Sequence, residues 1–242
     1  MYRIGIDVGS TYTKFCVASE RGELREAYAE KTPVEQKQYF QEKCAHLKET
    51  YPDSVLVSCG YGKKNIPALQ RMNELTALAR GAFFAAPDIE LVLDIGGQDT
   101  KVISQREGKL KGFFMNDKCA AGSGMFFENT RKLLGIAMGD IDLTGQVRPA
   151  IALSSVCAVF AQSEIVELIA DNYSGKDILY AVIWQILVKA RPLLDKGKEG
   201  PVLLSGGMTQ IKGMESYAEL ALERRCRIVE NSLYLSAIGC TL

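Results

Sequence analysis

Short apolar runs that end in glycine turns alternate along this chain with longer stretches of helical spacing. Residues 2–8 (YRIGIDV) alternate between apolar and polar positions, and turns at 9–11 and 21–22 separate two further runs of this kind. Alternation bounded by turn residues predicts a strand–turn–strand–turn–strand meander. The apolar positions of 32–51 recur at helical spacing, so a helix is predicted there.

A further strand and helix follow, and the same pattern then starts again at Leu91. Residues 54–62 (SVLVSCGYG) predict a buried parallel strand, and a helix is predicted over about 68–85. At Leu91, shortly after Pro87, the runs LVLDI, TKVISQ and KLKGFFM predict a second meander. Helices are then expected at about 120–135, 158–171, 174–196 and 209–223, with strands at VLLSGG and RIVE and a last short helix.

Two segments look like one unit used twice. Asp7-Val-Gly-Ser-Thr and Asp94-Ile-Gly-Gly-Gln each place an aspartate at the end of a strand, directly before a turn. This internal repeat predicts an α/β fold with two similar lobes around a cleft, each lobe built on a mixed sheet. We expect an N-terminal lobe over 1–88 and a C-terminal lobe over 89–242.

Composition narrows the classes of function. Lys+Arg and Asp+Glu number 29 each, so nothing favours binding to nucleic acid or to a membrane surface. No apolar run reaches the roughly 18 residues of a spanning helix, and the expected location is the cytoplasm. The single histidine, His46, lies on a polar helical stretch, which argues against histidine metal sites and Ser-His-Asp catalysis.

The aspartate turns predict a site for a nucleotide and Mg²⁺. Asp7 and Asp94 are expected to hold Mg²⁺ through its waters, because this ion keeps much of its hydration shell. Backbone N–H groups of glycine turns approach phosphates closely. A strand–Gly-Gly–helix junction suits an α-phosphate and adenosine. The predicted nucleotide-binding residues are Gly9, Ser10, Thr11, Lys14, Gly96, Gly97, Gln98, Gly206, Gly207 and Met208.

Together the three turns resemble the nucleotide site of the acetate and sugar kinase/heat-shock protein/actin superfamily. A Walker P-loop is absent, since GxxxxGK[ST] does not occur. Gln98 and Asp99 are the expected groups that orient or activate water at the γ-phosphate, alongside the catalytic Asp7 and Asp94, because such catalysis consists mostly of positioning and electrostatics.

Two of the seven cysteines have matched settings. Cys119 and Cys157 each precede a helical pattern, and a helix N-terminus stabilises anionic sulfur. Two such thiols are half of the four ligands of a [4Fe–4S] cluster, and a homodimer with its axis through the cluster would supply the other two. The remaining five are expected to be small buried hydrophobes: Cys16, Cys44, Cys59, Cys226 and Cys240.

Five motifs carry a resemblance to a family: GIDVGSTYTK, LDIGGQDTK, NDKCAAGSGMFFE, SSVCAVFAQSEI and SGGMTQIKG. They closely resemble the activators of 2-hydroxyacyl-CoA dehydratases, which are grouped with the BadF/BadG/BcrA/BcrD ATPases. The resemblance spans essentially the whole chain. It implies a homodimer that shares one [4Fe–4S] cluster held by Cys119 and Cys157 of each subunit. It further implies that ATP binding and hydrolysis to ADP drive a low-potential electron, received from a donor such as ferredoxin or flavodoxin, into a partner iron–sulfur dehydratase or reductase.

Two positions depart from the pattern of the family. Leu78 stands where a histidine often follows the helix glutamate, Glu74, by four residues, and Ile211 stands where an asparagine usually follows the late Gly-Gly. The departure at Leu78 concerns a contact on a helix face, and the departure at Ile211 concerns the residues that would contact adenosine.

Two other interpretations stay open at this point. A small-molecule kinase of the same superfamily would phosphorylate a sugar or a carboxylate, and it would need an acceptor pocket and a catalytic base but no metal cluster. A nucleotide-gated scaffold without turnover would form filaments or bind partners, again without a metal. Phosphoryl transfer to an added acceptor would favour the kinase, and a brown colour after anaerobic preparation would favour the electron-transfer activator.

Overall fold

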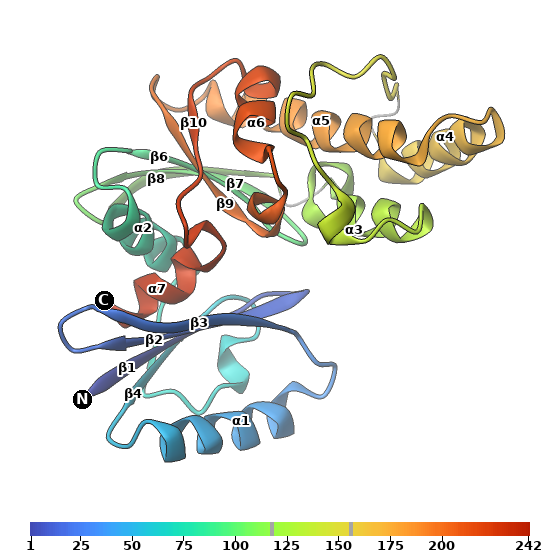
Figure 1. Ribbon diagram of the computed structural model, residues 1–242. Helices are drawn as coiled ribbons and strands as arrows, with labels where there is room; N and C mark the ends of the chain where they lie inside the picture. Colours follow the sequence, from blue (N-terminus) through green and yellow to red (C-terminus); the bar gives the residue numbers. More distant parts are fainter. Residues whose placement is uncertain (117–118, 155–156) are drawn as a thin grey trace. The chain divides into compact units, whose positions relative to one another are not determined.

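The computed structural model describes residues 1–116, 119–154 and 157–242 (Figure 1). Residues 117–118 and 155–156, which belong to two of the motifs quoted above, lie outside the described part. The chain forms two compact units, one of 1–90 with 103–112 and 229–242, the other of 91–102 with 113–228. The division into lobes at residue 88 stays a prediction.

The first unit contains a five-stranded mixed sheet with the order β3-β2-β1-β4-β5. Its strands are β1 (Tyr2–Val8), β2 (Tyr12–Ser19), β3 (Leu24–Lys31), β4 (Val55–Cys59) and β5 (Gln70–Arg71). The meander β1–β2–β3 is antiparallel, whereas β4 runs parallel to β1 and to β5. The predicted meander and the buried parallel strand are confirmed.

Helices cover both faces of this sheet (Figure 1). On one face α1 (Gln36–Thr50) buries Phe40, Cys44 and Leu47 against apolar residues of β1 and β2. On the other face, α7 (Leu235–Thr241) packs on β1 and on α2 (Glu74–Ala85). The last residues of the chain therefore complete the core of the first unit.

The start predicted for the helix over 68–85 is several residues too early. Gln70–Arg71 form β5 beside β4, and α2 starts only at Glu74. The side chain of Asn73 accepts a hydrogen bond from Leu75 N at 2.9 Å, which caps the helix at this position. A short strand of two polar residues has no periodicity, so the pattern of apolar positions could not separate it from the helix.

The second sheet has the order β10-β9-β6-β7-β8. Its strands are β6 (Leu91–Ile95), β7 (Thr100–Arg106), β8 (Lys109–Asn116), β9 (Val202–Gly206) and β10 (Cys226–Arg227). The helices of the second unit are α3 (Gly124–Leu133), α4 (Ala158–Ala170), α5 (Gly175–Leu194) and α6 (Met214–Leu222). Apolar residues of β6 and β9 form one large core with α5 and α6. None of the helices in the described ranges is long and apolar enough to cross a membrane.

The two sheets repeat one topology. In each, the first strand of the meander lies at the centre, the second and third follow on one side, and two later strands lie on the other side. The later strands β9 and β10 run parallel to β6, as β4 and β5 run parallel to β1. This arrangement confirms the α/β fold with two similar mixed sheets, which the internal repeat around Asp7 and Asp94 predicts.

The contact between α2 and α7 gives a prediction of stability. A Cβ atom on Gly239 would collide with the backbone carbonyl of Ala77, and one on Gly81 would collide with that of Leu235. We expect Gly239→Ala to lower the free energy of unfolding by about 3 kcal/mol, because two backbones in contact cannot separate without loss of packing. Urea denaturation measures this. Gly139→Ala, whose Cβ would meet no described atom within 4 Å, is the control, and equal effects of both substitutions would contradict the prediction.

Candidate nucleotide and cluster site

The first candidate turn follows β1. Asp7 lies at the end of this strand and is 6% exposed. Lys14 is its cross-strand partner on β2, and Lys14 Nζ donates to Asp7 Oδ2 at 3.1 Å. The thiol of Cys59, at the end of β4, lies 3.6 Å from Asp7 Oδ1. Asp7 is thus fixed by one cation and one neutral donor.

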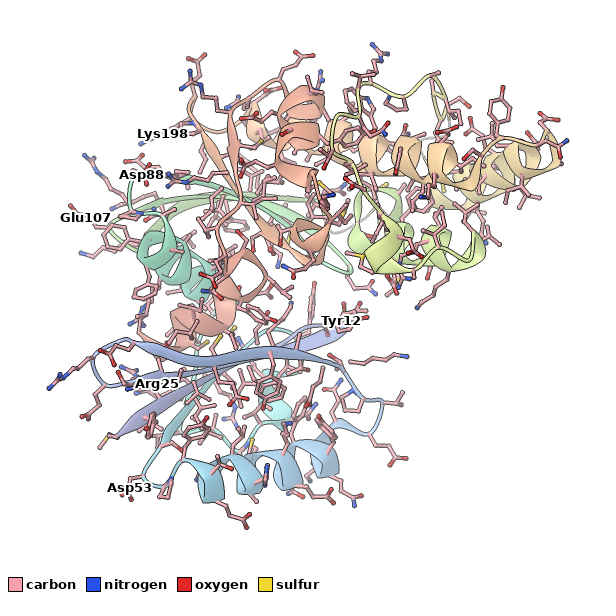
Figure 2. All side chains as sticks on the ribbon, in the orientation of Figure 1. Tyr12, Arg25, Asp53, Asp88, Glu107 and Lys198 are labelled. Atoms are coloured by element: carbon pink, nitrogen blue, oxygen red, sulfur yellow. The ribbon has the colours of Figure 1, made fainter. Side chains whose placement is uncertain are left out.

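The backbone of residues 9–11 is held from a distant part of the chain. Gly9 N donates to Tyr12 O at 3.2 Å, and Tyr12, labelled in Figure 2, begins β2 beside this turn. Thr32 Oγ1 donates to Gly9 O at 2.8 Å, and Thr32 N donates to Thr11 O at 2.9 Å. Sequence reasoning missed Thr32, because a residue at the end of β3 shares no local pattern with the turn that it supports.

One hydroxyl at this turn suits a ligand. Thr11 Oγ1 is buried and has no hydrogen-bond partner among the described residues. A buried hydroxyl without a partner costs free energy, so a phosphate oxygen that accepts from it would remove this cost. Ser10 beside it is exposed. The turn therefore fits a phosphate group.

The second candidate turn follows β6 and has the same local geometry. Gly96 N donates to Asp99 O at 2.9 Å, as Gly9 N donates to Tyr12 O in the first turn. Lys101 Nζ lies 3.5 Å from Asp94 Oδ2 and 3.4 Å from Asp99 Oδ1. Sequence reasoning missed Lys101, although it follows Asp94 by the same spacing as Lys14 follows Asp7.

The two residues that were expected to act on water differ in position. Gln98 is exposed at the tip of the second turn, whereas Asp99 is 4% exposed and directed toward Lys101. The roles of both at a γ-phosphate remain predictions.

The second turn is bonded to the start of α3. Gly124 N donates to Gly96 O at 2.8 Å, and Met125 N donates to Gly97 O at 3.0 Å. The hydroxyl of Thr100 donates to Gly122 O, in the short helical turn Ala120–Gly122 that Cys119 precedes. Two hydrogen bonds from the predicted phosphate turn, and one from Thr100 at the start of β7, thus join this region to the segment that begins at a predicted metal ligand.

The third turn lies at the same sheet edge as the second. Ile95 and Gly206 are register partners of the parallel strands β6 and β9, so the turns that follow them are neighbours. Gly206 has a φ of 102°, and a Cβ atom there would collide with the carbonyl of Ile95. A Cβ built on Gly207 would meet no described atom within 4 Å, whereas the side chain of Met208 is buried in the core. Only Gly207 of these three is open to a ligand on this side.

The two expected metal ligands are the accessible cysteines of this chain. Cys157 is exposed and directly precedes α4, and Cys119 is half-buried at the start of the turn Ala120–Gly122. Burial holds the pKa of Lys189, on α5, below its ordinary value, and the electrostatic effect of Cys119 and Cys157 opposes this shift. Both thiols are therefore within electrostatic reach of one ammonium group.

The other five cysteines are buried, as the sequence predicts: Cys16, Cys44, Cys59, Cys226 and Cys240. Burial raises the pKa of Cys44 to about 11 and that of Cys226 to about 12. A hydrogen bond with Cys240, together with burial, raises the pKa of Cys59. With their pKa raised in this way, Cys44, Cys59 and Cys226 stay neutral and inert at physiological pH.

The donor set fits a soft metal centre only in part. Within the described ranges, no group of three or more His, Cys, Asp or Glu side chains is placed to hold a metal ion. Two accessible thiols at helix starts are suited to iron–sulfur ligation, but a cluster with four protein ligands needs two more from another chain.

The two departures from the family pattern are core residues. Leu78 is buried in the first unit beside the close contact of α2 with α7, and Ile211 is buried in the core of the second unit. At both positions a buried apolar side chain that packs in the core stands in place of the polar residue of the family pattern. Neither side chain is exposed to a ligand.

A sequence model of the BadF/BadG/BcrA/BcrD ATPase family matches residues 4–239. The (R)-2-hydroxyglutaryl-CoA dehydratase activating ATPase of Acidaminococcus fermentans is 31% identical over 252 residues, which cover 100% of this chain and 96% of that protein. The solved activator of the 2-hydroxyisocaproyl-CoA dehydratase from Clostridium difficile, with bound ADPNP, superposes with a TM-score of 0.88 at 27% identity, covering 100% and 93% of the two chains.

A distant structure confirms the predicted fold. The ROK family glucokinase from Streptomyces griseus, solved in complex with glucose and AMPPNP, has a TM-score of 0.61 at 13% identity and covers 100% of this chain and 98% of its own. At this identity the likeness concerns the fold alone, which is the kinase and actin-like fold expected from the three turns. The family match over nearly all residues, together with the relative in Acidaminococcus, shows that this chain belongs to the BadF/BadG/BcrA/BcrD ATPase family.

Proposed function

We propose that this protein is an ATP-dependent electron-transfer activator. In this proposal a homodimer shares one [4Fe–4S] cluster, and ATP hydrolysis drives a low-potential electron into a partner iron–sulfur enzyme such as a 2-hydroxyacyl-CoA dehydratase. An external donor such as ferredoxin or flavodoxin supplies the electron. The names of the relatives in Acidaminococcus and Clostridium support the dehydratase as the class of partner.

One observation carries the proposal. The predicted phosphate turn at Gly96-Gly97 shares two hydrogen bonds with the segment that starts at Cys119, and Thr100, which begins β7 after this turn, adds a third inside the second unit. A movement of this turn on nucleotide binding or hydrolysis would therefore be transmitted to a cluster ligand, Cys119, through a few covalent bonds and hydrogen bonds. A kinase without a metal centre needs no such connection, and no contact in the described structure favours that alternative.

The residues of the turns have separate roles in nucleotide binding. Asp7 and Asp94 hold Mg²⁺ through its waters, and the N–H groups of the two aspartate turns bind the β- and γ-phosphates. The free hydroxyl of Thr11 donates to a phosphate oxygen. Gly206, Gly207 and Met208 form the boundary of the α-phosphate and adenosine site through their backbone.

The cysteines provide the metal ligands. When bound, the cluster supplies transfer of a single electron at low potential. Cys119 and Cys157 hold it as thiolates, which the adjacent helix starts stabilise. Burial of the five remaining thiols excludes them from this role.

The surface beside Cys157 suits a second copy of the chain. Val159 and Phe160, at the start of α4, are 70% and 69% exposed. These apolar side chains lie close to Cys157, and a cluster held by Cys119 and Cys157 needs two further thiols from another chain. We therefore expect Val159 and Phe160 to lie in the interface of the homodimer. The partner copy would then complete the ligand set and cover these side chains together.

Hydrolysis of ATP by Gln98→Ala tests the nucleotide half of the proposal. We expect turnover to fall by about 10²-fold, because Gln98 is the exposed group at the tip of the turn that can orient the attacking water. Binding of a non-hydrolysable ATP analogue should change little. An unchanged rate of hydrolysis would show that Gln98 has no catalytic role.

A further inference from the structure

An open groove, lined mostly by apolar side chains, lies between α3 and α4 of the second unit (Figure 1). Its cavity volume is about 120 Å³. Among the side chains that line this α3–α4 groove, Phe126 and Ile165 are buried, whereas Leu133 and Val159 are 49% and 70% exposed. The groove therefore has a buried apolar floor and apolar walls that reach the surface, as in sites that bind an apolar group.

The groove starts beside both predicted cluster ligands. Ala120 directly follows Cys119 and Ala158 directly follows Cys157, and both alanines line the groove. In the proposed homodimer the two-fold axis passes through the cluster, so it also passes close to this end of the groove. A second copy of the chain is therefore the molecule that would lie nearest to the groove.

Phe160, on α4, is an aromatic side chain that its own chain leaves 69% exposed. An α-helix turns by about 100° per residue, so Phe160 projects from the side of α4 opposite to Gln162 and Ile165, which line the groove. Glu167, which follows Phe160 by about two turns on the same side of the helix, is also exposed. Phe160 is thus an isolated aromatic group next to polar surface.

Two-fold symmetry can bring Phe160 and the groove together. In an isologous interface both copies use the same surface, so a side chain that projects from one copy meets a hollow on the other copy twice. A two-fold axis at the start of α4, directed across the helix, reverses the direction of α4 in the second copy. The groove of the second copy then lies on the same side of the axis as Phe160 of the first.

The groove also has a suitable size for an aromatic ring. An apolar cavity of roughly 150 Å³ takes up a whole benzene molecule. The α3–α4 groove, at about 120 Å³, is slightly smaller but open to the surface, so a phenyl ring can enter it from outside. Aromatic side chains that fill such pockets near the centre of an interface contribute most of its binding free energy.

We infer that Phe160 of each copy inserts into the α3–α4 groove of the other copy in the homodimer. The second copy then supplies both the two missing thiols and the side chain that fills the groove beside them. This inference rests on the proposed function, because the shared cluster places the two-fold axis, and it adds the contact by which the copies recognise each other.

Photo-cross-linking of the reconstituted protein tests this contact. Phe160→p-benzoylphenylalanine keeps an aromatic side chain and reacts under ultraviolet light with neighbouring C–H bonds. Unlabelled and ¹⁵N-labelled chains are mixed in metal-free form before anaerobic reconstitution, so that mass spectrometry separates links between chains from links within a chain. We expect links from residue 160 of one chain to α3 of the other. The same label at Leu220, an exposed position on α6, is the control and should give no link to α3 of the other chain.

The rate at which an iron chelator bleaches the cluster gives a second test. Phe160→Ala should raise this rate about tenfold, because the loss of two interface aromatic groups per dimer lets the copies separate more often. Leu133→Ala, which shortens one wall of the groove, should also raise it. Since the two side chains touch each other across the interface, F160A/L133A should bleach no faster than Phe160→Ala alone. Leu220→Ala should bleach at the wild-type rate.

Several outcomes would overturn the inference. A cluster-containing dimer in which residue 160 links only to its own chain, or only to parts of the other chain outside α3 and α4, would show that Phe160 does not occupy the groove. Links that form only after a partner iron–sulfur enzyme is added would assign this surface to that enzyme. Additive effects of Phe160→Ala and Leu133→Ala would also contradict the contact. A colourless monomer would instead contradict the proposed function itself, on which the inference rests.

Discussion

Cys119→Ser and Cys157→Ser are each expected to abolish cluster binding. In a homodimer that shares one cluster, a single substitution removes two of the four ligands at once, and the remaining pair cannot hold the cluster. Iron and acid-labile sulfide after anaerobic reconstitution should therefore fall from the wild-type content to background. Binding of ATP should persist, since neither thiol belongs to the three nucleotide turns.

A buried cysteine provides the matched control. Cys44 packs in the core of the first unit, so Cys44→Ala should keep the full iron content at a small cost in stability. In the metal-free wild-type protein, an alkylating reagent should modify two thiols of the native chain, Cys119 and Cys157, and all seven after denaturation. Retention of a full cluster by either serine variant would mean that the ligands are other residues.

Asp94→Asn and Asp7→Asn are expected to reduce ATP turnover by about 10²-fold or more. Loss of a carboxylate charge weakens the hold on Mg²⁺, and the metal stabilises the charge that develops on the transferred phosphoryl group. Steady-state hydrolysis measured across a range of Mg²⁺ concentrations would show the loss, with partial recovery at high Mg²⁺. The iron content of both variants should equal that of wild type.

Asp142→Asn is the matched control for these substitutions. Asp142 pairs with Lys212 at 2.6 Å on the exposed surface of the second unit, so its replacement should leave turnover unchanged. A loss of the cluster in Asp94→Asn with normal hydrolysis would contradict the separation of the two sites.

Much of this architecture could be predicted from the sequence. Strands that end in aspartate and glycine are recognised by apolar runs and turn residues, which are local signals. The repetition of one unit around Asp7 and Asp94 predicts two similar sheets, and the structure confirms that they share one topology. The distinction between Cys119 and Cys157 and the five buried cysteines can also be predicted from local pattern, since these two are the cysteines that directly precede a helix.

Other features depend on contacts between distant segments. Thr32 supports the first turn from the end of β3, and Gly239 allows α7 to touch α2, yet neither stands out in its own neighbourhood of the sequence. The start of α2 was misplaced because the short strand β5 is defined by its pairing with β4 and not by its composition. Lys101 had a signal, namely the spacing that it shares with Lys14, but its burial between two carboxylates appears only in three dimensions.

The content of iron and acid-labile sulfide per chain, measured after anaerobic purification together with the molecular mass, tests the central claim most directly. One [4Fe–4S] cluster shared by two chains predicts about two irons and two sulfides per chain, in a particle of twice the mass of the chain. A colourless monomer that stays free of metal after anaerobic reconstitution would contradict the account.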